Sequence, residues 1–250
     1  MYRQKVIVLP TPIEPQKMLE ITLNSARSYG MLAPSTSWDD LRILDYNEIV
    51  PLDLDTDVYV HLKKEHADAL MEHGTIKFGT LRSFRESEDD HSRDRNEGAI
   101  ITWIVNKDFS YIEVGAIGDY NHVYCTSLTP KKNERLRKFG ESTVRIKNPN
   151  RFWKLVSEHI EMTPVRLSKV IYAPLNAVQL KTDKVCGLPR ALEAPKRDQL
   201  EAQIALAFIK RPEFSPEQEC RFMWVSESGQ KVGSKVYQIP QLRPLLERVD

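Results

Sequence analysis

The 250-residue chain lacks the short motifs that identify the most common enzyme folds. No GxGxxG, GxxxxGK[ST], HExxH or GxSxG segment occurs where it could work, which disfavours dinucleotide-binding folds, P-loop enzymes, HExxH zinc enzymes and serine hydrolases. Cysteine is scarce: Cys125, Cys186 and Cys220 are widely separated and odd in number, which argues against a disulfide framework and against a CxxC zinc site. We therefore expect a protein of the reducing cytoplasm.

Long hydrophobic runs and an excess of one charge are absent as well. Residues 1–10, MYRQKVIVLP, hold only a short apolar run closed by proline, and no stretch approaches the roughly 18 apolar residues of a membrane span. The 36 basic and 35 acidic residues give a net charge of +1, so no global field attracts nucleic acid or a membrane surface, although a local patch still can. We expect neither secretion nor membrane insertion.

What the chain does contain is the composition of an ordinary globular protein, with 41% apolar and 28% charged residues. Alternating β-branched and aromatic residues predict strands, and apolar spacings of three and four predict helices. The strands are expected at residues 5–9, 57–62, 75–79, 99–105, 110–117, 122–128, 142–147, 165–173, 176–180, 217–226 and 235–239. The helices are expected at residues 14–29, 63–74, 133–140, 148–162 and 197–210.

This order does not alternate regularly between strand and helix, which disfavours a doubly wound parallel sheet. It predicts an α+β fold in which helices flank a mostly antiparallel sheet. We expect residues 57–250 to form one such domain of a catalytic type, and residues 1–56 to be an N-terminal extension packed on it.

Polar side chains mark the ends of two predicted strands. His61 ends VYVHL, where an imidazole can hydrogen-bond a ribose or an amide, or can simply be half-buried. Thr126 and Ser127 lie near the end of VYCTSLT, where short hydroxyls suit a ligand ribose and equally suit ordinary cross-strand pairing. Ser127 has no base in its local sequence and is not predicted to be a nucleophile.

Two glutamates enter a late strand in KRPEFSPEQECRFMW. Period-two alternation would send Glu217 and Glu219 to one face, where their repulsion requires a cation, a proton or a ligand between them. Such a cost is more readily tolerated at a functional site. The alternative is a solvated edge strand in which Arg221 supplies the counter-charge.

A dense block of opposite charges, GTLRSFRESEDDHSRDRNEG at residues 79–98, follows the strand predicted at 75–79. Exposed ion pairs contribute only about 0–1 kcal/mol each, so stability alone is a poor reason to concentrate them. Arg82 and Arg85 could hold a pyrophosphate or a nucleic-acid phosphate through bidentate guanidinium contacts. Asp94 and Glu97 could then neutralise these arginines and shape the loop, or the whole block could be a solvent-facing loop of salt bridges.

Taken in order, these parts resemble the ADP-ribosyltransferase superfamily. The segments GTIKFGTLRSFRESEDDHSRDRNEG, VYCTSL and KRPEFSPEQECRF are more closely similar to an uncharacterised bacterial and phage-associated domain family that shares an R-x-x-E…D-x-x-EG block, a C-x-S strand and a late E-x-E-x-R strand. The resemblance covers residues 57 to about 240. It implies a split-sheet fold and NAD as a substrate.

The resemblance also implies roles for individual residues. His61 would contact a ribose of NAD, Thr126 and Ser127 would support the NAD-binding scaffold, Glu219 would be the catalytic glutamate, and Glu217 would orient the acceptor. Together with Arg82 and Arg85, these are the predicted site residues. The implied protein is a toxin or phage-defence effector that modifies a protein, RNA or DNA and is paired with an antitoxin or another partner protein. The chain departs from the pattern in lacking an aromatic lid motif and an arginine in VYVHL.

Two other classes of function remain open. A metal-dependent nuclease or phosphoesterase could use hard-cation ligands from the charged block, namely Glu86, Glu88, Asp89, Asp90, His91 and Asp94, although no rigid partner motif accompanies them. A non-enzymatic module could bind nucleic acid or protein through KKNERLRKFG and RALEAPKR. The bases of the first segment, Lys131, Lys132, Arg135, Arg137 and Lys138, could form a solvated helix face or steer a nucleic-acid acceptor.

Overall fold

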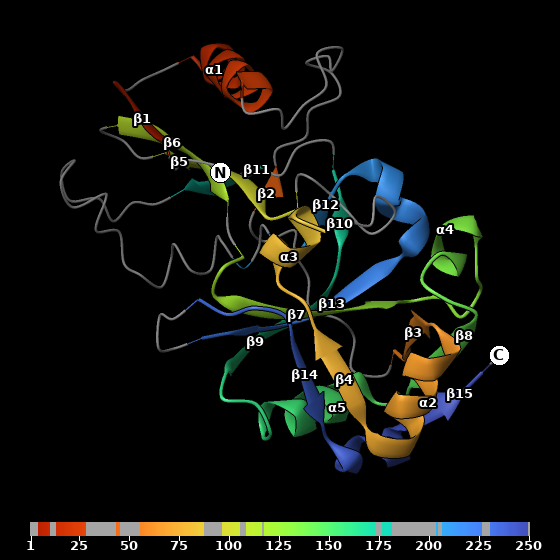
Figure 1. The fold of residues 1–250 in the computed structure, drawn as a ribbon. Helices are drawn as coiled ribbons and strands as arrows, with labels where there is room; N and C mark the ends of the chain where they lie inside the picture. Colours follow the sequence, from red (N-terminus) through yellow and green to blue (C-terminus); the bar gives the residue numbers. More distant parts are fainter. Residues whose placement is uncertain are drawn as a thin grey trace. The chain divides into compact units, whose positions relative to one another are not determined.

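The computed structural model describes residues 5–10, 14–28, 44–45, 56–87, 97–105, 109–116, 118–173, 177–181, 204, 207–226 and 231–249. The chain divides into two compact units, and each is assembled from segments that are distant in sequence. Unit 1 contains residues 1–49, 98–117 and 171–212, and unit 2 contains residues 50–97, 118–170 and 213–250. The chain has the predicted α+β character: the sheets of unit 2 are antiparallel, and unit 1 combines antiparallel and parallel strand pairs (Figure 1).

Unit 1 is built on a five-stranded sheet of order β1-β6-β5-β11-β2. Strands β1 (Lys5–Pro10), β6 (Phe109–Ala116) and β5 (Ala99–Val105) pair antiparallel, and β11 (Ala177–Lys181) runs parallel to β5 and to β2 (Leu44–Asp45). Helix α1 (Pro15–Ser28) and the parallel pair β10 (Ile171–Tyr172) and β12 (Ile209–Lys210) complete the described elements of this unit.

The N-terminal residues therefore supply strands to a sheet with residues 99–116 and 177–181. This division differs from the expected boundary at residue 56, because hydrogen bonding between strands groups segments that the sequence order separates.

Unit 2 contains a six-stranded sheet of order β15-β8-β3-β7-β13-β9. Its strands are β3 (Val58–Leu62), β7 (Asn121–Ser127), β8 (Ser142–Ile146), β9 (Thr163–Lys169), β13 (Glu219–Val225) and β15 (Leu246–Arg248). A separate antiparallel pair joins β4 (Thr75–Phe78) to β14 (Lys235–Gln238). The helical elements are α2 (Lys64–His73), α3 (Leu81–Arg85), α4 (Glu134–Arg137), α5 (Pro149–Ser157) and the 3-10 helices η2 (Pro212–Glu217) and η3 (Pro240–Leu245).

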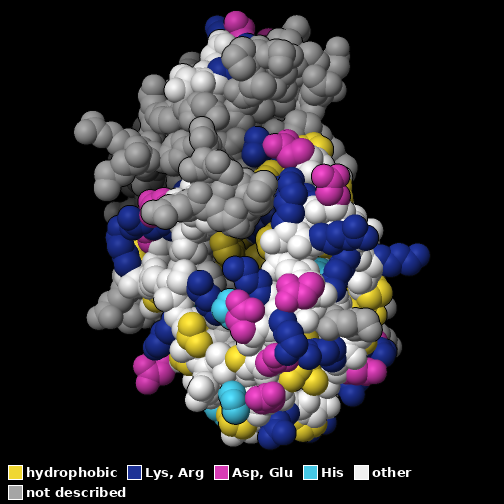
Figure 2. All heavy atoms as spheres, turned by 45° about the vertical axis from the view of Figure 1, so that its right-hand side comes forward, with side chains coloured by type: hydrophobic (Ala, Val, Ile, Leu, Met, Phe, Trp, Pro, Cys, Tyr) yellow, Lys and Arg dark blue, Asp and Glu magenta, His cyan; other side chains and the backbone are white. Residues whose placement is uncertain are grey.

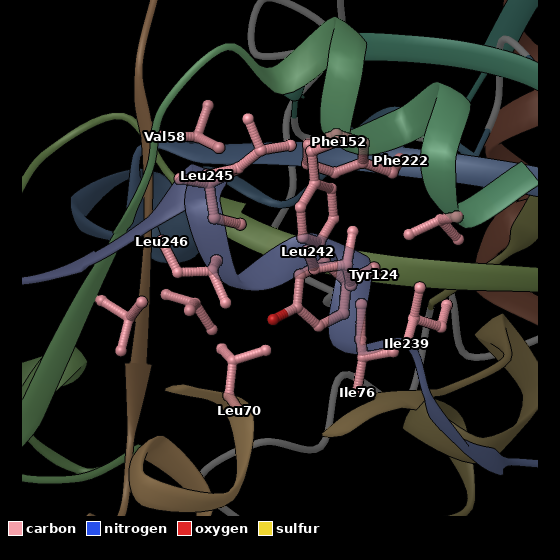
Figure 3. Packing of buried hydrophobic residues seen from close by; sticks show 14 of the residues in the cluster. Val58, Leu70, Ile76, Tyr124, Phe152, Phe222, Ile239, Leu242, Leu245 and Leu246 are labelled. Carbon is pink, nitrogen blue, oxygen red and sulfur yellow. The ribbon is translucent and has the colours of Figure 1, made fainter. Parts of the chain in front are cut away.

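The core of unit 2 lies on one face of this sheet, because alternate residues of each strand are apolar. Helices α2 and α5 and the 3-10 helix η3 cover that face (Figure 3). The cluster combines strand residues with helix residues, among them Val58, Tyr124, Phe222, Leu70, Phe152 and Leu242. The residues between them in the strands point to the opposite face, which carries the polar groups described below.

Capping residues in the sequence predict where a helix begins. Asn148 caps α5 by accepting a hydrogen bond from the Arg151 amide, and Pro149 occupies the first turn, so the predicted start is confirmed. The helix ends at Ser157, earlier than the predicted residue 162. None of the helices in the described ranges is both long enough and apolar enough to cross a bilayer.

Two local predictions were wrong. Residues 209–210, expected at the end of a helix, form β12, because their backbones pair with β10 and this tertiary pairing overrides helical propensity. Helix α3 was not predicted inside the charged block. It forms because Thr80 and Ser83 cap each other reciprocally at its first turn.

Gly74 lies where α2 contacts the segment at Ile239, close to the C-terminus. It ends α2 in the left-handed conformation (φ 64°), and its carbonyl accepts a hydrogen bond from Ile239 N at 3.0 Å. A Cβ here would overlap the Ile239 carbonyl. Gly74→Ala is therefore expected to lower the free energy of unfolding by about 3 kcal/mol in urea titrations. Gly233→Ala is the control, since nothing lies near the added carbon. Equal effects of both changes would contradict this account.

Candidate functional site

Three neighbouring strands bring the predicted residues together. Strand β7 lies between β3 and β13, and Ser127 pairs with Tyr59 on one side and with Glu219 on the other. Residues opposite each other in a ladder point to the same face, and His61 lies two residues from Tyr59. His61, Ser127 and Glu219 thus share the polar face of the sheet, across strands roughly 5 Å apart (Figure 1).

A chain of hydrogen bonds connects His61 to Glu217. His61 Nε2 contacts the Thr129 carbonyl at 3.2 Å, Thr129 N donates to Ser127 Oγ at 3.2 Å, and Ser127 Oγ donates to the Glu217 carbonyl at 2.8 Å. His61 Nδ1 contacts Thr143 Oγ1 at 3.2 Å. Burial lowers the pKa of His61, the contact with the Thr129 carbonyl opposes this, and Lys132 lowers it further. The neutral imidazole is therefore favoured.

Glu219 belongs to a buried ionic cluster. Arg221 Nε donates to Glu219 Oε1 at 2.6 Å, and the two terminal nitrogens of Arg221 donate to Glu97 Oε1 and Oε2 at 2.7 and 3.0 Å. The relative exposures of Glu97, Glu219 and Arg221 are 2%, 3% and 1%, so this guanidinium contacts both carboxylates away from water. Burial opposes the charge of Arg221, but Glu219 and Glu97 outweigh it and hold its pKa well above the ordinary value.

Glu217 has a different partner. Arg135 Nε of α4 donates to Glu217 Oε1 at 2.5 Å, and the same guanidinium lies 4.0 Å from the centre of the Phe214 ring. Asn133 Nδ2 donates to the Pro216 carbonyl at 2.6 Å. Helix α4 is therefore fastened to η2, the turn that precedes Glu219.

The prediction that Glu217 and Glu219 point to one face of a strand was wrong. Glu217 ends the 3-10 helix η2, and Gln218 has a positive φ of 44°, which breaks the alternation before β13 begins. The solvated edge strand was also wrong, because β13 lies between β7 and β9. Arg221 does supply the counter-charge to Glu219, but in a buried site.

The remaining predicted site residues are Thr126, Arg82 and Arg85. Thr126 Oγ1 donates to the Cys220 carbonyl at 3.0 Å, a cross-strand bond. Arg82 is exposed and contacts Glu86 and Asp119. Arg85 donates to the Glu97 backbone carbonyl at 2.5 Å.

The acids of the metal-site alternative are mostly not placed. Glu88, Asp89, Asp90, His91 and Asp94 lie outside the described residues, and Glu86 pairs with Arg82. Among the residues that the structure describes, no group of three His, Cys, Asp or Glu side chains is arranged to hold a metal ion. The metal-dependent nuclease stays a prediction.

The sequence reasoning missed the partnership of Glu97 with Arg221. These residues belong to the D-x-x-EG and E-x-E-x-R segments, and the structure joins the two motifs through one guanidinium. Their separation of 124 residues left no local signal.

Comparison with known proteins found no matching family model, no similar curated protein and no similar solved structure.

Removing Arg221 is expected to be more damaging than removing one of its partners. Arg221→Met leaves Glu97 and Glu219 without this guanidinium, and loss of one partner from a buried ion pair costs about 3–5 kcal/mol. Glu97→Gln keeps the Arg221 contact with Glu219 and replaces a charged bond by a neutral one, so about 1–2 kcal/mol is expected. Urea unfolding at pH 7 measures both changes. A smaller loss for Arg221→Met than for Glu97→Gln would contradict this order.

The buried side chain of His122 leads to a prediction of how the free energy of unfolding changes with pH. His122 is buried beside Phe78, and its Nδ1 has no hydrogen-bond partner among the described residues. Burial, then the charge of Lys235, lowers its pKa to about 4, against the effect of a hydrogen bond to the Gly79 backbone. The unfolded state binds this proton more readily than the folded state does. The contribution of neutral His122 to the free energy of unfolding is therefore complete above its unfolded pKa of about 6.5, and it is lost as the pH falls towards 4.

His122→Phe is expected to flatten this part of the curve of unfolding free energy against pH. Urea titrations between pH 7.5 and pH 4 measure it, with the exposed His73→Gln as the control. Parallel curves for the wild type and His122→Phe would show that the imidazole does not titrate as described.

Proposed function

We propose that the protein is an NAD-dependent ADP-ribosyltransferase with a fold of that superfamily, acting on a macromolecular acceptor as a toxin or defence effector. The observation that carries the proposal is the placement of Tyr59, Ser127 and Glu219 in one row across β3, β7 and β13, with a buried carboxylate at its end. The three sequence motifs that resemble the superfamily thereby meet on one face of one sheet.

The chemistry requires a carboxylate near the ribose. As the bond between nicotinamide and ribose C1′ breaks, nicotinamide leaves with the bonding electrons and the sugar gains oxocarbenium character. The carboxylate of Glu219 stabilises this charge and polarises the ribose 2′-hydroxyl. A nucleophile of the acceptor then forms the new bond to C1′ and gives up its proton.

The predicted site residues have different roles in this proposed reaction. Arg221 donates to both oxygens of Glu219, at 2.6 and 3.3 Å. Arg221 thus orients Glu219. His61 and Ser127 already bond Thr129, Thr143 and Glu217, so their role is to hold the three strands in place.

In this assignment, Glu217 lies on the acceptor side. Its carboxylate is joined to Arg135 of α4, and its carbonyl is joined to Ser127. Arg82 and Arg85 are proposed to contact the pyrophosphate of NAD only after exchange of their present partners. They are secondary to Glu219 in the proposal.

The test is transfer of label from NAD. Purified protein is incubated with NAD labelled in the adenylate part and with protein, RNA and DNA acceptors, and the labelled acceptor is quantified. Glu219→Gln is expected to reduce transfer by about 10²-fold or more, the scale for loss of a group that stabilises transition-state charge. NAD is expected to raise the melting temperature of the wild type.

Glu97→Gln is the matched control, because it removes the other carboxylate from the same guanidinium and leaves Glu219 in place. It is expected to lose stability comparably and to retain most of the transfer. If Glu97→Gln abolishes transfer as completely as Glu219→Gln, the carboxylate of Glu219 has no direct role. If the wild type neither transfers label nor is stabilised by NAD, the proposal fails.

A further inference from the structure

A short basic surface lies next to the turn that carries Glu217. We call residues 131–139 the α4 platform. Lys131, Arg137 and Lys138 are exposed on it, and Phe139 exposes 37% of its surface, which makes it one of few large apolar side chains exposed in the described chain. Figure 2 shows Lys and Arg side chains interspersed with Asp and Glu side chains on the face that it presents. The surface thus combines bases with one exposed aromatic ring.

The platform is held rigidly. Asn133 caps α4 by accepting from Leu136 N at 2.9 Å, and the side chain of Leu136 is buried. Phe139 N donates to the Leu136 carbonyl at 3.1 Å. Gly140 follows with a φ of 151°, and a Cβ there would overlap the backbone of Leu62. The position of Phe139 is therefore fixed by the chain on both sides of it.

The platform is also joined to the candidate catalytic turn. Asn133 bonds the Pro216 carbonyl, and Arg135 bonds Glu217 and stacks on Phe214. Arg135 bonds the buried Glu217, whereas Lys131, Arg137 and Lys138 are exposed. A polyanion bound to the exposed bases would lie beside the residues that lead into Glu219.

We propose that the α4 platform docks a single-stranded nucleic acid. Phosphates would lie against Lys131, Arg137 and Lys138, and one unpaired base would stack on Phe139. Stacking on an exposed ring distinguishes a single strand from a duplex, whose bases are covered, and from an acidic peptide, which offers only charge. That this strand is the acceptor of ADP-ribose rests on the proposed function; the binding itself does not.

Fluorescence anisotropy with labelled 12-nucleotide DNA and RNA strands measures this binding without NAD. The variant Lys131→Glu/Arg137→Glu/Lys138→Glu is expected to weaken binding at least 30-fold, and the salt slope of the wild type, log Kobs against log salt, is expected to exceed that of the variant by about 2. The control Lys77→Glu/Arg151→Glu/Lys154→Glu makes the same charge change at exposed sites on β4 and α5 and is expected to bind like the wild type within about threefold.

The aromatic contact has its own pair of variants. Phe139→Ala is expected to weaken binding roughly tenfold, on the scale of one stacked base, while leaving the salt slope unchanged. Tyr120→Ala is the control, since Tyr120 is also exposed (46%) but lies outside the platform. A duplex of the same sequence and a poly-glutamate peptide are expected to bind more weakly than the single strand.

Equal losses for the platform and control variants would overturn the inference, and so would tighter binding of the peptide or the duplex. The two proposals can fail separately. Label transfer to a protein without strand binding would refute the platform alone. Platform-dependent strand binding with no transfer of label to any acceptor would refute the enzyme alone.

Discussion

The buried charge of Arg221 is the constraint on which the polar face of unit 2 depends. An ionised side chain that is 1% exposed is compatible with a stable fold only if carboxylates and hydrogen bonds replace the water it has lost. Glu219 supplies one partner from the same strand, and Glu97 supplies the other from 124 residues away. The polar face thus holds together two segments that the core face does not join.

This arrangement explains how β13 can be buried along nearly its whole length and still alternate. Its even-numbered side chains, such as Phe222 and Trp224, enter the hydrophobic cluster, while Glu219 and Arg221 face the other way. A sheet with two apolar faces would be simpler to stabilise. A charged face that is excluded from water costs stability, but electrostatic interactions there are stronger than at a solvated surface. That property suits a site that must stabilise a developing cation.

Most elements of unit 2 were predictable because their signals are local. Gly74 ends α2, Asn148 begins α5, and the alternation in β7 and β13 is visible in the sequence. The pairing of Ser127 with Glu219 was not predicted; the resemblance implied only that both belong to one site, since strand order and register depend on contacts across the chain.

The missed features share a physical cause. The pairing of Glu97 with Arg221 and the strands that the N-terminal segment forms with residues 99–116 and 177–181 arise from partners distant in sequence. The positive φ of Gln218 is invisible to pattern reasoning, because glutamine rarely adopts it. A single backbone angle of this kind shifted Glu217 out of the strand and invalidated the expected shared face.

That same angle resolves the repulsion between the two glutamates. Two carboxylates separated by one residue could have shared a proton or a cation; here the turn at Gln218 gives each its own guanidinium, Arg135 for Glu217 and Arg221 for Glu219. The first pair joins η2 to α4, and the second lies within β13. Because the two ion pairs use different arginines, a macromolecule that engages α4 can act on Glu217 without disturbing the carboxylate proposed to face the ribose. Under the proposed function, the spacing of E-x-E would separate acceptor recognition from chemistry, through the positive φ of Gln218 between the two glutamates.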